Sequence, residues 1–429
     1  MLRILFIALL FMPSLCFADN EQFSGANTAW ILTSTALVLL MTLPGLALFY
    51  GGLVRKKNVL SILMQCFAIG SISSILWFIL GYSIAFGDGN GFIGDFSKVM
   101  MNGITKESLS GDIPEVLFAL FQMTFAVITP ALIIGGFAER MKFASVLLFS
   151  ALWLLAVYAP VTHWVWGGGW LSEMGLYDFA GGVVVHITAG TAALVAALVL
   201  GPRRGFPKTP MLPHNLTMTV TGAGMLWVGW FGFNGGSALA ANGDAAMAML
   251  VTHLSAAAGT LTWAAIEWKK FGKASVLGAV TGMVAGLGTI TPASGFVGPG
   301  GALVIGVLAG FVCFYATVYI KQKLKIDDSL DVFPVHGVGG ILGTLLAGVF
   351  SATSLGVFSG FGFAEGISTM GEQVGVQLIG IVSTLVYTAV VTYVLLKLVG
   401  ILTKGIRVDE EQEISGLDQV EHEESGYNL

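Results

Sequence analysis

Two histidines stand at matched positions in two apolar segments of the sequence. His186 lies eight residues after Asp178, and His336 lies eight residues after Asp328. An ionisable side chain deep in an apolar segment is costly and indicates function. Because each neutral imidazole offers one donor and one acceptor, a pair in contact can share or relay a proton. The alternatives are two unrelated packed histidines or part of a metal site. Zinc needs three or four ligands, so two imidazoles alone make a poor site, and we expect no metal or cofactor.

Aromatic residues form a second group that could act on a small cation. Aromatic side chains in membrane segments are usually packing residues or interfacial anchors. A tryptophan face beside a hydroxyl acceptor can nonetheless hold a cation, with about 1 to 2 kcal/mol of attraction when partly desolvated. The residues with suitable spacing are Phe121, Phe125, Trp166, Trp230, Phe233 and the hydroxyl-bearing Ser237.

The composition shows what kind of element must position these residues. The 429 residues are 55% hydrophobic and only 10% charged, whereas soluble domains carry roughly 25% charged residues. The chain is therefore predicted to cross a membrane several times. The net charge of -5 reflects an acidic tail, so nucleic acid is not an expected partner. Three cysteines in or beside apolar runs offer neither a disulfide framework nor metal-ligand spacing.

The first segment is typical of a secretory signal. Residues 1–18 contain one basic residue, Arg3, a short apolar stretch, and the small residues of Cys16-Phe17-Ala18 before Asp19. We expect cleavage of this peptide. The alternative is a signal anchor that stays attached, although the run is short for a membrane span.

Eleven apolar stretches follow, each long enough to cross a hydrocarbon core of roughly 30 Å. Backbone amides cannot go unpaired in lipid and no strand-like alternation is visible, so the fold class is an all-α membrane protein. The stretches lie near residues 28–50, 59–86, 114–138, 143–165, 180–201, 215–234, 245–268, 275–291, 300–320, 332–352 and 373–402.

Charges in the connections predict the orientation. Alternate connections and the tail hold 17 lysines and arginines, whereas the intervening ones hold only Lys98 and Lys106. The positive-inside rule places the first set in the cytoplasm, with the mature N-terminus outside and the C-terminus inside.

The matched Asp–His pairs also indicate an internal repeat. Helices one to five and six to ten form related halves, followed by a final helix. Because each half has an odd number of spans, the second half is inverted relative to the first, an arrangement that places a site near the midplane. Eight residues of helix carry each histidine about 12 Å inward, so the two imidazoles approach from opposite faces.

Several long segments resemble a known family in their order along the chain. The segments are FQMTFAVITPALIIGGFAER, HWVWGGGW, DFAGGVVVHITAG, GWFGFNGGSA, DDSLDVFPVHGVGG and a GLD-containing tail. The chain resembles the bacterial Amt branch of the Amt/Mep/Rh ammonium transporters. The resemblance implies a homotrimer in the cell inner membrane that transports ammonium without an enzymatic step. Pro334 stands where some relatives are expected to carry glycine.

The resemblance also implies roles for individual residues. Phe125, Trp166 and Ser237 would bind the substrate, and Phe125 and Phe233 would form the gate. His186, His336 and Trp230 would line the pore, and Asp178 would provide structural support.

The resemblance divides the mature chain into residues 19–405, the transmembrane domain, and residues 406–429, a cytoplasmic regulatory tail. In that tail Gly416, Leu417 and Asp418 resemble a segment through which a PII-type signal protein acts. The alternative function is an ammonium sensor of the same fold that signals through its tail. A sodium-coupled transporter is less favoured, because no pair of interrupted helices with mid-depth carboxylates is visible.

Overall fold

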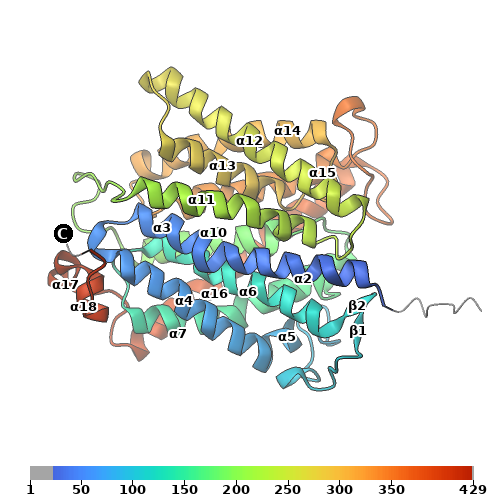
Figure 1. Cartoon of the computed structure of the whole chain (residues 1–429), viewed down its shortest axis with the longest axis horizontal. Helices are drawn as coiled ribbons and strands as arrows, with labels where there is room; N and C mark the ends of the chain where they lie inside the picture. Colours follow the sequence, from blue (N-terminus) through green and yellow to red (C-terminus); the bar gives the residue numbers. More distant parts are fainter. Residues whose placement is uncertain (1–22, 428–429) are drawn as a thin grey trace, which may run out of the picture.

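The computed structural model describes residues 23–427 as a bundle of long helices that run along the longest axis of the molecule (Figure 1). The expected signal peptide lies outside the described residues. Ten helices are long and apolar enough to cross a membrane, and an eleventh apolar helix, Val276–Ile290, has 15 residues. The eleven predicted stretches and the all-α membrane fold are confirmed within residues 23–427.

The first five spans are built from consecutive helical segments, several of them interrupted by π-helical turns. The segments are α2 (Gly25–Leu40), η2 (Met41–Leu46) and α3 (Ala47–Leu53); η3 (Lys56–Asn58), α4 (Val59–Leu76), η4 (Trp77–Gly81) and α5 (Tyr82–Phe86); α6 (Glu115–Phe137); α7 (Phe143–Trp153), η6 (Leu154–Tyr158) and α8 (Ala159–Trp166); and η7 (Gly182–Ile187) and α10 (Thr188–Leu200). Between α5 and α6 lie η5 (Val99–Met101) and a small hairpin of β1 (Leu109–Ser110) and β2 (Ile113–Pro114), and α9 (Trp170–Glu173) follows α8.

The second five spans, the final helix and the tail follow in the same manner. The segments are α11 (Leu216–Trp230) and η8 (Phe231–Gly235); α12 (Gly243–Phe271); α13 (Val276–Ile290); α14 (Pro299–Val318) and η9 (Tyr319–Lys323); η10 (Phe333–Gly337) and α15 (Val338–Phe350); η11 (Gly356–Phe358); α16 (Met370–Leu402); and the short α17 (Glu410–Ser415) and α18 (Leu417–His422).

Six of the seven π-helical turns among the described residues recur in matching spans of the two halves, whereas η4 of span two has no counterpart in span seven. Spans one and six contain η2 and η8, spans four and nine contain η6 and η9, and spans five and ten begin with η7 and η10. A π-helical turn inserts one residue into an α-helix and is frequent at functional sites. This recurrence agrees with the predicted repeat, and the turns of spans five and ten carry the two histidines.

Glycine allows three helices of the second half to pack closely. A Cβ atom on Gly259 of α12 would collide with the backbone of Gly282 and Gly286 of α13, and one on Gly310 of α14 would lie 2.7 Å from the carbonyl oxygen of Gly259. Small residues let helix backbones approach in membranes, where dispersion contacts replace the hydrophobic effect. The glycine repeats are therefore contact surfaces.

The connecting segments distinguish the two ends of the bundle. We call the end that carries the 17 cations the basic end. The other end has only two cations, Lys98 and Lys106, and its connections carry more carboxylates than cations, so we call it the acidic end. The tail helices α17 and α18 fold against the basic end, and the β1–β2 hairpin lies at the acidic end (Figure 1). The tail is thus an ordered part of the structure as far as residue 427.

Candidate functional site

The two predicted histidines meet in the centre of the bundle. The Nδ1 atoms of His186 and His336 are 3.1 Å apart, and the ring centroids are 5.2 Å apart with an angle of 19° between the planes. Both side chains are buried, with 1% and 4% exposure. Two nitrogens at this distance form a hydrogen bond only if one carries a proton and the other does not, so the pair shares one proton along this contact.

Backbone features specific to η7 and η10 bring the histidines together. Each histidine lies within its π-helical turn, and a glycine follows four residues later. A Cβ on Gly190 would collide with the backbone of Gly337, and one on Gly340 would lie 3.0 Å from the Cβ of His186. The repeated His-x-x-x-Gly spacing therefore reflects close packing of the two half-helices.

A narrow and almost entirely apolar passage surrounds the imidazoles. Its free volume is about 10 Å³, which is at the lower limit for a single water molecule. Nε2 of His186 has no hydrogen-bond partner among the described residues. The passage is lined by Met41, Leu46, Phe49, Ile128, Leu132, Val185, His186, Leu226, Trp230, Phe233, Val284 and His336. The aliphatic part of this lining carries no sequence signal that separates it from ordinary core residues.

Trp230 forms one wall of the passage. Its indole stacks on the ring of His186 with 5.5 Å between the centroids, and its Nε1 donates a hydrogen bond of 2.9 Å to the hydroxyl of Thr291. Because the indole is fixed at both its face and its nitrogen, it holds the imidazole of His186 in one orientation. Thr291 had no sequence signal, since a threonine at a helix end is common.

The predicted binding residues line a cavity at the acidic end. Phe125, Trp166 and Ser237 face this cavity of about 320 Å³. The Ser237 hydroxyl donates to the carbonyl oxygen of Phe233 at 2.8 Å, which leaves its lone pairs free to accept. The remaining lining residues, which were not predicted, are Phe86, Ser110, Phe118, Gln122, Phe179 and Leu239. Phe118 and Gln122 share a face of α6 with Phe125, a spacing that could have identified them.

Two phenylalanine rings separate this cavity from the passage. The centroids of Phe125 and Phe233 lie 4.3 Å apart, and the planes are tilted by 40°. Phe125 lines the cavity, whereas Phe233 lines the passage. The ring of Phe125 also contacts Phe121 and Trp166 edge to face. Any molecule that moves from the cavity to the histidines must displace or pass these rings.

Asp178 fixes the backbone that connects the cavity to His186. Its Oδ1 accepts from the amides of Gly181 and Gly182, and its Oδ2 accepts from those of Val183 and Val184. Its carbonyl oxygen accepts a 2.8 Å hydrogen bond from Nε1 of Trp166. The carboxylate thereby caps the start of η7, while the main-chain carbonyl of the same residue holds the indole.

Its repeat counterpart, Asp328, has a different environment. Its side chain is fully buried, one oxygen accepts from the amide of Phe333 at 2.7 Å, and Oδ1 has no hydrogen-bond partner among residues 23–427. Burial, together with the negative charge of Asp331, raises the pKa of Asp328 to about 7. The two matched aspartates thus differ in their hydrogen bonding, since both carboxylate oxygens of Asp178 accept from backbone amides.

A second cavity opens at the basic end next to His336. Its volume is about 230 Å³, and its walls include Tyr50, Glu267 and the ion pair between Lys321 and Asp331, at 2.8 Å. The acidic-end cavity, the narrow passage and this cavity lie in series. The ring of Phe125 in the acidic-end cavity contacts the ring of Phe233 in the passage, and His336 lines both the passage and the basic-end cavity. The sequence did not indicate the ion pair as part of the path.

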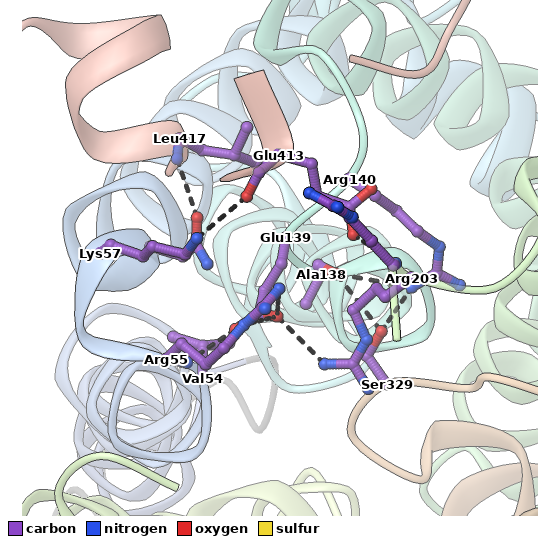
Figure 2. A network of polar contacts seen from close by, with 12 residues as sticks. Val54, Arg55, Lys57, Ala138, Glu139, Arg140, Arg203, Ser329, Glu413 and Leu417 are labelled. Carbon is purple, nitrogen blue, oxygen red and sulfur yellow. Dashed lines mark hydrogen bonds and ion pairs between the residues drawn. The ribbon is translucent and has the colours of Figure 1, made fainter. Parts of the chain in front are cut away.

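A buried ion network connects the loops of the basic end (Figure 2). Glu139 accepts hydrogen bonds from Nε of Arg55 and Nη1 of Arg203, and Arg203 also forms a bidentate contact with Asp327. Arg140 donates to the carbonyl oxygen of Asp327. Burial alone would raise the carboxyl pKa values, but the guanidinium groups outweigh it, so the pKa values of Glu139 and Asp327 lie below their ordinary range.

The three predicted tail residues lie against the loop between the first two spans. The amide of Leu417 donates to Oδ1 of Asn58 at 2.8 Å, and Oδ1 of Asp418 accepts from the amide of Ser61 at 2.8 Å, which caps α4. Gly416 has φ +103 and packs on Lys57 so closely that a Cβ would lie 2.6 Å from the carbonyl oxygen of that lysine.

Glu413, which was not predicted, completes the docking of the tail. Its carboxylate is buried and accepts from the amide of Arg204 at 2.7 Å and from Nη2 of Arg407 at 2.8 Å. Nζ of Lys57 donates to its carbonyl oxygen (Figure 2). Its position three residues before Gly416 is the sequence signal that could have found it.

Two further histidines, His163 and His214, lie near helix ends, where the sequence alone predicts hydrated side chains. His163 is instead 1% exposed because the segment after α5 folds over it. His214 is partly buried and contacts the carbonyl oxygen of Val54 and the hydroxyl of Tyr427 in the tail.

Known proteins are similar to this chain in both sequence and fold. The model of the family described as Ammonium Transporter Family matches residues 29–427 of this chain. A putative ammonium transporter of Methanothermobacter thermautotrophicus is 50% identical over 95% of this chain and 99% of its own length. Among solved structures, Mep2 of Saccharomyces cerevisiae has a TM-score of 0.82 and 39% identity, with 92% of this chain and 89% of that chain covered. A Sensor Amt Protein has a TM-score of 0.86 and 29% identity, with 92% and 98% covered. The chain belongs to the ammonium transporter family.

Proposed function

We propose that this protein recruits ammonium at the acidic-end cavity, removes a proton from it, and conducts ammonia past Phe125 and Phe233 and the paired histidines to the basic end. The observation that carries this proposal is the pair of imidazoles, 3.1 Å apart, in a passage with about 10 Å³ of free volume. Relatives that carry the name ammonium transporter support the choice of substrate.

The dry passage explains how such a transporter would select its substrate. Removing the hydration shell of an ion costs at least several kcal/mol even after relaxation. Ammonium escapes this cost when it gives up a proton, whereas potassium and sodium have no proton to lose. The rings of Phe125 and Phe233 keep bulk water out, and the imidazoles supply one donor and one acceptor to a neutral guest.

The acidic-end cavity has the chemistry of a recruitment site. Trp166 and Phe125 present aromatic surfaces to a cation, and the Ser237 hydroxyl can accept one of its N–H bonds. Asp178, whose carboxylate oxygens are bound to backbone amides and whose carbonyl oxygen is bound to the Trp166 indole, acts in this proposal as structural support for Trp166 and η7.

Uptake and current measured together test the proposal. Wild type, His186→Ala and His336→Ala are reconstituted in proteoliposomes, and ammonium uptake and current are recorded with and without potassium. We expect wild type to exclude potassium and to carry net charge, since concentrative uptake needs an energy source. Both variants are expected to lose uptake or selectivity. Equal potassium exclusion in all three proteins would remove the histidines from the mechanism, and uptake without current would refute the net movement of charge.

We also infer the wider assembly from family membership. The protein acts as a homotrimer in the cell inner membrane, with residues 1–18 cleaved, the mature N-terminus outside, residues 19–405 forming the transport domain, and the basic end in the cytoplasm. Residues 406–429 form the regulatory tail to which a PII-type signal protein responds. The docking of Glu413, Gly416 and Asp418 against cytoplasmic loops supports this role.

Deletion of residues 408–429 tests the role of the tail. We expect loss of PII association or altered transport, with the protein still assembled, as judged by mass in detergent. Unchanged transport and unchanged PII association would reject the regulatory role. A sensor function would instead require ligand-dependent signalling with little uptake, and the uptake assay decides between them.

A further inference from the structure

The β1–β2 hairpin contributes a second hydroxyl to the acidic-end cavity. Ser110 lines this cavity together with Trp166 and Ser237. Within the hairpin it pairs with Ile113, which is 1% exposed. Because residues directly opposite each other in an antiparallel pair have their side chains on the same face, Ser110 shares the buried face of Ile113. The side chain of Ser110 therefore turns toward the bundle.

The hydroxyl of Ser110 is available to a bound molecule. The hydroxyl of Ser108, two residues earlier, accepts a hydrogen bond of 3.0 Å from the amide of Thr105. In contrast, the Ser110 hydroxyl has no hydrogen-bond partner among residues 23–427. A hydroxyl oxygen carries two lone pairs, so Ser110 can accept from a donor that enters the cavity.

An ammonium ion needs several partners once it leaves bulk water. It carries four N–H bonds, and each must meet an acceptor or an aromatic face to offset the lost hydration. Phe125, Trp166 and Ser237 supply two aromatic faces and one hydroxyl. The amide oxygen of Gln122, another polar residue of the lining, is inaccessible. Ser110 is thus placed to receive an N–H bond that the other three residues leave without a partner.

Asn27, in the first turn of α2, ties the hairpin to the segment after η8. Its Nδ2 donates to Oδ2 of Asp112 at 2.6 Å, and its Oδ1 accepts from the amide of Ala241 at 2.8 Å. The amide of Ser24, the N-cap of α2, adds a hydrogen bond of 2.8 Å to the carbonyl oxygen of Asp112. The hairpin accordingly lies beside the start of α2 (Figure 1). Because an amide side chain both donates and accepts, Asn27 alone holds both segments.

The segment after η8 is held in a conformation that its sequence disfavours. It carries Ser237 and Leu239, which both line the cavity, and reaches Asn27 through the amide of Ala241. Leu239 has φ +54, in the left-handed region that leucine rarely adopts. Such a conformation persists only where surrounding contacts fix it, and the hydrogen bond from Ala241 to Asn27 is one of these contacts. Asn27 thus fixes Ser110 and Ser237 relative to each other.

We propose that Ser110 contacts the ammonium ion as a second hydroxyl acceptor in the acidic-end cavity, and that Asn27 is the positioning residue that places it relative to Ser237. This inference rests on the proposed function, since it adds a contact for the same substrate at the same site. Affinity for ammonium, rather than the rate of conduction, depends on the hairpin, because the passage beyond Phe125 and Phe233 is unchanged.

Calorimetric titration of the purified full-length protein with ammonium chloride, at constant ionic strength, tests the contact. Ser110→Ala should raise Kd about three- to tenfold, as for loss of one hydrogen bond. Ser110→Thr keeps the hydroxyl and should restore a Kd close to that of wild type. Ser172→Ala removes an exposed hydroxyl at the same end that does not line the cavity, and its Kd should equal that of wild type. An unchanged Kd in Ser110→Ala would overturn the proposal.

The positioning role of Asn27 is tested by combining variants. Asn27→Ala leaves the Ser110 hydroxyl in place but frees the hairpin, so Kd should rise. If Asn27 acts through Ser110, the double variant should raise Kd by less than the product of the two single effects. A rise equal to that product would refute the positioning role. Asp112→Ala breaks the same contact from the hairpin side, and its combination with Ser110→Ala decides the outcome should Asn27→Ala fail to fold.

Uptake in proteoliposomes separates this inference from the proposed function. KM for ammonium should rise in Ser110→Ala by the same factor as Kd, with the maximal rate unchanged. A lower maximal rate with the wild-type KM would argue against a contact in recruitment and overturn the role of Ser110. A wild-type protein that binds ammonium but takes none up would refute the proposed conduction, and the calorimetric comparison would still decide whether Ser110 contacts the ion.

Discussion

At the residue scale, Trp166 has two separable contributions to the acidic-end cavity. Its face borders the space where a cation would bind, and its Nε1 donates to the carbonyl oxygen of Asp178. Trp166→Leu should raise KM about five- to thirtyfold, because about 1 to 2 kcal/mol of cation–π attraction is lost. Trp166→Phe keeps an aromatic face and should raise KM less. Ammonium uptake over a range of concentrations gives the values. Equal KM in Trp166→Leu and wild type would exclude the indole from recruitment.

The hydrogen bonds of Asp178 predict that its substitution lowers the stability of the protein. Four backbone amides lose their acceptor in Asp178→Ala, and buried donors without partners destabilise by about 1 to 3 kcal/mol each at most. We expect a lower melting temperature in detergent for Asp178→Ala and an intermediate value for Asp178→Asn, which retains one acceptor oxygen. Asp244→Asn, an exposed carboxylate in the first turn of α12, serves as the control and should leave the melting temperature unchanged. Identical melting of all four proteins would contradict the capping role.

At the element scale, the loops of the basic end depend on Glu139 and Asp327 being charged. Because the pKa values of both carboxyls are lowered in the folded state, their contribution to stability is present above the ordinary values of 4.5 and 3.8 and is lost as pH falls through the lowered values. Melting temperature measured against pH should therefore decline below about pH 4.5.

Glu139→Gln isolates this effect. Loss of the charge leaves Arg55 without a carboxylate partner and removes one of the two carboxylate partners of Arg203 in a buried site, which should destabilise the protein by about 3 kcal/mol at neutral pH. The decline in acid should also become shallower. Glu410→Gln removes the largely exposed partner of Arg204 and should change stability by less than about 1 kcal/mol. A Glu139→Gln protein with the wild-type acid profile would show that the network does not titrate.

The docked tail depends on a conformation that favours glycine. Gly416 has φ +103, and a Cβ there would meet the backbone and side chain of Lys57. Gly416→Ala should release the tail, and limited proteolysis should cleave the tail faster than in wild type. Ser415→Ala, at an exposed neighbouring position, should be cleaved at the wild-type rate. A Gly416→Ala tail as resistant as wild type would mean that the close contact with Lys57 is not needed for docking.

At the scale of the whole molecule, the sequence predicted the parts that depend on composition and spacing. The lengths of the apolar stretches located eleven helices. The repeated Asp–His spacing predicted that His186 and His336 approach each other, and the structure places them in contact. The π-helical turns were not predictable, because one inserted residue leaves hydrophobicity unchanged. The burial of His163 was predicted wrongly, since it depends on a loop 73 to 78 residues earlier in the chain. The docking of Glu413 was missed because two of its partners, Lys57 and Arg204, lie far away in sequence.

The opposite charge of the two ends gives a final prediction. Exposed carboxylates at the acidic end outnumber Lys98 and Lys106; they include Asp88, Glu107, Glu173, Asp244, Glu365 and Glu372. Such a surface raises the local concentration of cations, and salt screens it as the Debye length falls from about 30 Å at 0.01 M to about 10 Å at 0.1 M.

The apparent KM for ammonium should therefore rise about two- to fivefold over that range of an inert salt, with the maximal rate unchanged. Combining Glu365→Gln with Glu372→Gln should reduce this dependence. Glu410→Gln, at the basic end, should leave it intact, because its charge lies on the far side of the bundle. If KM were the same at both salt concentrations, attraction by the acidic end would contribute nothing to recruitment, and the aromatic cavity alone would account for capture of the ion.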